Sequence, residues 1–135
     1  AEEIEIQSRY LDIERERFSD RLAVSFDVPE PLRPALLPSL ILQPLVENAV
    51  KHGVGAVDGA ITVRVRAEAE RDTLIVHVEN TAQEAPVLRP GEGVGLRNVA
   101  ERLQARFGQA GQLTSGRGDG LFRATIRMPL RMGQA

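Results

Sequence analysis

Two polar segments of the sequence have the residue types needed to bind a phosphorylated ligand. In the first, Gly91, Gly93 and Gly95 form a G-x-G-x-G run directly before a predicted helix that begins near Leu96. Glycines let the backbone approach a ligand closely, and the free N–H groups at the start of a helix attract anions. The run therefore predicts an anion site, most naturally for phosphate, with a simple glycine hinge as the alternative.

The second segment is Glu47-Asn48-Ala49-Val50-Lys51-His52-Gly53. Asn48 and Lys51 are three residues apart and so share one face of a helix. An asparagine offers a neutral oxygen to Mg²⁺, and a lysine offers a compact positive charge to phosphate. The alternative is a solvated helix end, in which Lys51 favours the C-terminal dipole, Gly53 is the cap and His52 lies beyond the last regular turn.

A third candidate is Asn80, which follows a predicted strand at the start of a 15-residue polar loop over 81–95. A side-chain amide there can bond the edge of an adenine; a turn-forming asparagine is the alternative. Loops of this length without periodicity are uncommon and are often lids over a site. Among the arginines of the following helix, Arg102 is the one expected to reach inward.

Composition excludes several classes of protein. The chain has 135 residues with a net charge of −2, so one domain is expected and long-range attraction to nucleic acid is not. It contains no cysteine and two histidines, which excludes disulfides and thiolate chemistry and disfavours a histidine-rich metal site. The longest uncharged stretch, Pro34–Val46, is too short to span a bilayer, and no signal peptide is visible, which fits a cytoplasmic domain without direct membrane contact.

Hydrophobic periodicity predicts a two-layer α/β sandwich of the α+β class, with a mostly antiparallel sheet covered by helices on one face. A turn-rich stretch is expected over 111–120, and Gly108 is expected to end the third helix. The predicted helices are 1–20, 39–51 and 96–107, and the predicted strands are 22–28, 61–67, 73–79 and 121–128.

The first helix has apolar residues at helical spacing among many charges. This spacing predicts a stripe that packs on the domain or on a partner helix. No capping residue precedes the helix, so we expect it to continue a longer one. The stripe comprises Ile4, Ile6, Tyr10, Leu11, Ile13 and Phe18, with Arg17 in the same series.

In their order, the segments LILQPLVENAVKHG, VEN, GEGVGLRNVAERL and the final MPL resemble the GHKL ATPase family. More narrowly, the chain resembles the catalytic ATP-binding domain of a LytS-like sensor histidine kinase. The resemblance covers nearly the whole chain and implies a Bergerat-type fold. It implies that residues 1–20 end the phosphoacceptor and dimerisation helix, including its linker, and that residues 21–135 form the ATP-binding domain.

The resemblance also implies roles for individual residues of the second helix. Asn48 matches the N-box asparagine that ligates Mg²⁺ bound to the triphosphate. Lys51 matches the N-box base near the phosphates, and His52 occupies a position beside the nucleotide. Glu47 is a polar candidate near the γ-phosphate.

Gly91, Gly93 and Gly95 match the second glycine box of the family, whose backbone borders the triphosphate. Val94 lies within this box, and Leu96 begins the helix behind it. These residues are therefore expected to contribute to nucleotide binding.

The first glycine box of the family reads D-x-G-x-G, and here the sequence departs from it. One register places Asn80, Ala82 and Glu84 at these positions, and another makes Glu79 the acid. An asparagine can still accept the adenine amino hydrogen, but the bond lacks the strength that a charged acceptor provides. The loss of both glycines changes the hinge of the lid.

The resemblance implies a histidine kinase domain that uses ATP and Mg²⁺ and transfers the γ-phosphoryl group to a histidine on an upstream helix. Pro44 stands where related ATPases often carry a water-activating residue, which favours phosphotransfer over hydrolysis. Neither His52 nor His77 is expected to be the acceptor. Expected partners are ATP, that helix within a homodimer, and a response regulator, and a membrane sensor can precede the domain in the full-length protein. The alternatives are a nucleotide-degenerate interaction module and an anti-sigma-type serine kinase.

Overall fold

The structure, a computed structural model, describes residues 2–18, 22–38, 40–56, 61–81, 94–118 and 121–132. Within these ranges no helix is both long and apolar enough to cross a membrane. The elements are the helices α1 (Glu2–Phe18), α2 (Gln43–Ala56) and α3 (Val94–Phe107), the 3-10 turns η2 (Glu30–Leu32) and η3 (Gly108–Ala110), and the strands β1 (Leu22–Asp27), β2 (Ile61–Glu70), β3 (Thr73–Thr81), β4 (Gln112–Gly118) and β5 (Leu121–Pro129).

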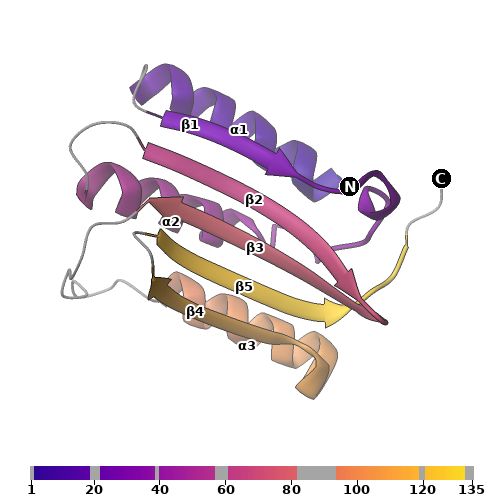
Figure 1. Ribbon diagram of the computed structural model, residues 1–135. Helices are drawn as coiled ribbons and strands as arrows, with labels where there is room; N and C mark the ends of the chain where they lie inside the picture. Colours follow the sequence, from indigo (N-terminus) through magenta and orange to yellow (C-terminus); the bar gives the residue numbers. More distant parts are fainter. Residues whose placement is uncertain are drawn as a thin grey trace.

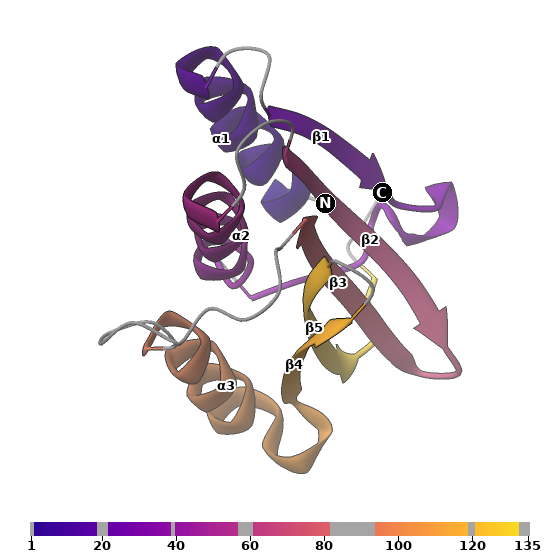
Figure 2. The same cartoon turned by 60° about the vertical axis from the view of Figure 1, so that its left-hand side comes forward.

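The strands form one sheet in the order β1-β2-β3-β5-β4. The β1–β2 pair is parallel, and the other pairs are antiparallel. All three helices lie on the same side of this sheet, with α1 beside β1, α2 behind β2 and β3, and α3 behind β4 and β5 (Figures 1 and 2). The predicted α+β two-layer architecture is therefore confirmed.

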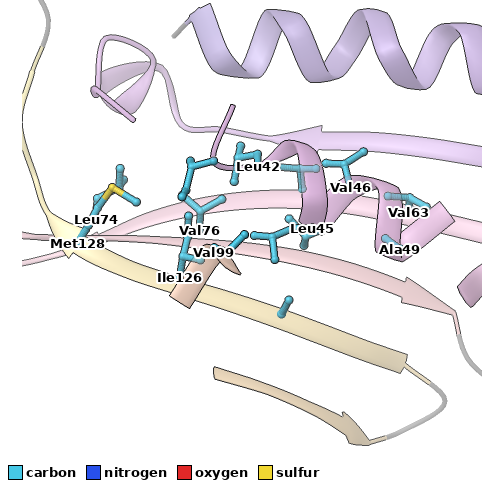
Figure 3. Close-up of a cluster of buried hydrophobic side chains, with 14 of the residues drawn as sticks. Leu42, Leu45, Val46, Ala49, Val63, Leu74, Val76, Val99, Ile126 and Met128 are labelled. Carbon is cyan, nitrogen blue, oxygen red and sulfur yellow. The ribbon is translucent and has the colours of Figure 1, made fainter. Parts of the chain in front are cut away.

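The core lies between the sheet and the helices (Figure 3). Leu45 and Val46 of α2 are almost fully buried against inward-facing valines of β2 and β3. Val99 and Leu103 of α3 close the other side of the same cluster, as their spacing predicted. Burying a side chain of this size contributes roughly 1.5–3 kcal/mol relative to leaving it in water. Helix packing against the sheet therefore depends on these few positions.

The boundaries of α2 differ from the prediction. The helix begins at Gln43 rather than near residue 39, and the carbonyl of Leu42 accepts its first hydrogen bond from Val46 N at 2.9 Å. Pro44 is then the second residue of the helix. An N–H at that position would have no partner within the helix, so proline removes no helical hydrogen bond there. The helix continues to Ala56, so Gly53 is not a cap and the backbone of His52 is helical, contrary to expectation.

The stretch predicted to be turns contains a strand. β4 pairs along its whole length with β5, and Leu113 lies opposite Ile126. Its own residues include two glycines and exposed polar side chains, which have low intrinsic strand preference. Pairing with a neighbouring strand therefore overrides local preference at this edge of the sheet.

The buried face of α1 is only partly the predicted one, since Leu11 is buried as expected but polar residues are buried beside it. Ile13 is 64% exposed, whereas Glu3, Gln7 and Glu14 are buried beside Leu11. Ile4 and Tyr10 pack partly against the core, and the side chains of Arg17 and Phe18 lie outside the described residues. The helix is therefore held to the domain by a largely polar face.

We expect Gly111 to tolerate replacement poorly, because a Cβ there would lie 2.4 Å from the carbonyl oxygen of Leu103 in α3. Gly111→Ala should lower the free energy of unfolding by about 1–3 kcal/mol, as overpacking does. Gly116→Ala is the matched control, since nothing lies within 4 Å of its added Cβ. Urea denaturation of both variants measures the difference, and equal stabilities would contradict the packing at Gly111.

Candidate nucleotide-binding site

Asn80 lies near the end of β3, on the face of the sheet that the helices cover. Val76 and Val78 precede it on the same face and belong to the core. The Asn80 side chain is 1% exposed, and its Nδ2 donates a hydrogen bond to the carbonyl of Thr81 at 2.9 Å. Its Oδ1 is buried and has no hydrogen-bond partner among the described residues. Because such an atom is costly to leave unpaired, this position is ready to accept a hydrogen bond from a ligand.

Glu79, the alternative acid, points to the opposite face of the sheet. Both of its carboxylate oxygens are occupied: Arg66 Nε donates to Oε1, and Arg123 Nη2 donates to Oε2 at 2.8 Å. Burial by itself raises the pKa of Glu79, but the hydrogen bonds and charges of the two arginines outweigh it and hold this pKa below its ordinary value. Glu79 is thus engaged in the sheet and is not available on the helical face.

His77 lies on the same outer face as Glu79, as expected from its alternation with the valines. Its Nδ1 is 2.8 Å from Thr125 Oγ1, and its Nε2 is 3.3 Å from Glu68 Oε1. The side chain is 8% exposed. These contacts describe a structural histidine, consistent with the expectation that it is not a phosphoacceptor.

The residues predicted to form the N-box lie along α2. Glu47 is exposed and accepts a hydrogen bond from Gln43 Nε2 at 2.9 Å, while Asn48 is half-buried. Lys51 and His52 have helical backbone, but their side chains lie outside the described residues.

α3 supplies the other side of the candidate site and packs directly against α2. It begins at Val94, so Val94 and Gly95 are in its first turn, two residues earlier than predicted. Leu96 is half-buried against the core. Arg102, the arginine expected to reach inward, is exposed, and its Nη1 lies 3.4 Å from the carbonyl of Leu40. The predicted positions Ala82, Gly91 and Gly93 lie outside the described residues.

A group of polar residues near the start of α2 was missed by the sequence interpretation. Glu3 and Gln7 of α1 are buried and hydrogen-bonded to the segment 40–43. The signal available was weak: Glu3, Gln7, Leu11 and Glu14 follow helical spacing, but three of them are polar and do not form an apolar stripe.

Comparisons with known proteins place the chain among sensor kinases, although no family model matches it. It is 36% identical over 132 residues to the sensor histidine kinase BtsS of Escherichia coli K12, covering 97% of this chain and 24% of BtsS. It is 31% identical over 112 residues to the sensor histidine kinase YesM of Bacillus subtilis, covering 80% of this chain and 19% of YesM. The sensor protein LytS of Enterococcus faecalis is 32% identical over 82% of this chain and 21% of its own length. The chain therefore spans about a quarter or less of these relatives.

Solved structures agree on the fold. The catalytic domain of histidine kinase ThkA superposes with a TM-score of 0.71 at 16% identity, over 95% of this chain and 91% of that one. The mycobacterial sensor histidine kinase MprB gives a TM-score of 0.67 at 19% identity, over 96% and 95% of the two chains.

Fold and sequence together define a histidine kinase catalytic domain of the GHKL type. Within that class, the chain is related to the sensor histidine kinases BtsS and YesM and to the sensor protein LytS.

The Glu79 ion pairs predict an acid-dependent stability. Because the pKa of Glu79 is lowered by folding, its contribution is complete above the unfolded-state pKa and is lost as the pH falls through the folded-state pKa. Glu79→Gln should lower the free energy of unfolding at pH 7 by about 1–3 kcal/mol and flatten its decline between about pH 5 and pH 3. Denaturation across this range measures both effects. Glu101→Gln, at an exposed position of α3, should follow the wild type.

Proposed function

We propose that this domain binds Mg-ATP between α2 and α3 and transfers the γ-phosphoryl group to a histidine on a segment outside this chain. The observation that carries the proposal is the buried, unpaired Oδ1 of Asn80 on the helix-covered face. The kinship with sensor histidine kinases supports ATP as the nucleotide.

In this proposal, Asn80 recognises the adenine. Its Nδ2 is engaged by the Thr81 carbonyl, which leaves Oδ1 as the free acceptor for the adenine amino group. The bond is neutral, where the family pattern has a carboxylate, so the affinity for adenine is lower than with an aspartate. We assign Ala82, at the next position of the same box, to the nucleotide site.

The phosphates and the metal are assigned to the two helices. Asn48 would hold Mg²⁺ that is bound to the triphosphate, because an amide oxygen suits a hard cation that keeps most of its waters. Lys51 and His52 follow on α2. We assign the second glycine box, with Gly91, Gly93, Val94, Gly95 and Leu96, to the triphosphate; its last three residues form the start of α3. The bound cation would neutralise charge on the phosphates. The helix start of α3 adds positive potential for the same anion.

Transfer then depends on position and charge rather than on covalent chemistry by the protein. Glu47 lies one residue before Asn48 and is exposed, so it can face the reacting groups near the γ-phosphate. We assign residues 1–20 to the end of the phosphoacceptor helix and its linker, and 21–135 to the catalytic domain. A homodimer and a response regulator are the proposed partners; the structural relative ThkA has been solved in complex with the response regulator protein TrrA.

Adenine recognition by Asn80 can be tested with a matched pair of nucleotides. ITP carries a carbonyl oxygen where ATP carries the amino group, so the wild type should prefer ATP. Asn80→Ala should weaken ATP binding about tenfold, the effect of one lost buried hydrogen bond, and leave ITP binding nearly unchanged. Calorimetry with Mg²⁺ present measures both affinities. An undiminished preference for ATP in the variant would assign adenine recognition elsewhere.

The transfer reaction can be tested with a histidine-bearing acceptor fragment supplied in trans. The wild-type chain should form acid-labile, base-stable phosphate on the fragment and none on itself. Asn48→Ala should slow transfer at least about tenfold through loss of the metal ligand, whereas Gln109→Ala, an exposed amide outside the site, should not. Acid-stable phosphate on serine would support the serine kinase alternative, and no nucleotide binding would support the degenerate module.

A further inference from the structure

The side chain of Gln7 connects α1 with the N-box helix. It is 0% exposed, and its Nε2 donates hydrogen bonds to Gln43 Oε1 at 2.9 Å and to Glu3 Oε1 at 3.3 Å. Gln43 in turn donates from Nε2 to Glu47 Oε1 at 2.9 Å. Gln7, a buried residue of α1, is therefore linked through Gln43 to the carboxylate of Glu47, which directly precedes Asn48.

Glu3 fixes the backbone at the start of the same helix. Its carboxylate accepts hydrogen bonds from Leu40 N at 2.8 Å and from Leu42 N at 3.0 Å. α2 has no acidic residue in its own first turn, so Glu3 supplies the negative charge that the N-terminal end of a helix favours. Glu3 of α1 thus helps to fix the residue at which α2 begins.

Leu40 joins this contact to α3. It has a φ of +58°, a left-handed conformation that is uncommon for leucine. Its N–H is held by Glu3, and its carbonyl lies 3.4 Å from Arg102 Nη1. Conformations of this kind persist where neighbouring groups hold them. The same short segment therefore contacts α1 on one side and α3 on the other.

We infer that Gln7 and Gln43 are positioning residues that hold the Glu47 carboxylate for phosphoryl transfer and make its place depend on the docking of α1. The inference rests on the proposed function of Glu47. Within the described residues, Glu47 accepts a side-chain hydrogen bond from Gln43, and Gln43 is itself oriented by Gln7. Displacement of α1 removes the donor that orients Gln43, and with it the restraint on Glu47.

The test is a double-mutant cycle on phosphoryl transfer to the acceptor fragment, with kcat and the KM for ATP measured separately. Gln43→Met keeps the side-chain length and removes both hydrogen bonds. It should lower kcat about tenfold and change the KM for ATP by less than about twofold. Gln7→Met should also lower kcat. In a Glu47→Ala background, which is itself slow, neither glutamine change should reduce kcat further, because the group that they position is absent.

Gln109→Met, at an exposed position of η3, is the matched control and should leave kcat unchanged. The inference is overturned if Gln43→Met transfers at the wild-type rate while Glu47→Ala is slow. It is also overturned if the kcat of the double variant falls by the product of the factors measured for the two single variants. Should the buried Gln7→Met fail to fold, the half-buried Gln43 position decides alone. A wild-type chain that transfers nothing overturns the proposed function as well, whereas normal wild-type transfer with unaffected glutamine variants overturns only this inference.

Discussion

The burial of one face of α2 against β2 and β3 is the constraint on which the candidate site depends. Leu45 and Val46 cannot leave the core without exposing apolar surface, so the rotation of the helix about its axis is fixed. With that rotation set, Glu47 is exposed and Asn48 is half-buried at the border of the core. The burial of Leu45 and Val46 therefore determines where Glu47 and Asn48 lie.

β3 shows why one polar residue stands out among several buried ones. Its alternation places His77 and Glu79 on the outer face, where each finds partners on neighbouring strands. Asn80 lies on the face covered by the helices, the same face as Val76 and Val78 of the core. Its Oδ1 has no partner within the described residues. Since buried polar atoms in folded proteins are nearly always paired, the unpaired Oδ1 on this face supports the proposal that Asn80 binds a ligand.

Periodicity predicted the elements whose burial follows a regular pattern. The hairpin of β2 and β3, the apolar face of α3 and its end at Gly108, where φ is +62°, all follow from local preference. β4 could not be predicted, because its stability comes from pairing with β5. The buried face of α1 could not be predicted either, because Glu3 and Gln7 are buried only where the segment 40–43 supplies their hydrogen-bond partners.

The polar character of that interface affects how α1 can move. An apolar contact changes gradually with distance, whereas hydrogen bonds weaken steeply when their geometry is lost. Glu3 and Gln7 make several of these contacts at once, and Gln7 Oε1 remains buried without a partner among the described residues, which lowers the stability of the docked arrangement. Apolar anchoring of α1 rests chiefly on Leu11, with Ile4 and Tyr10 partly buried. The docking of α1 therefore depends on hydrogen-bond geometry as well as on apolar packing.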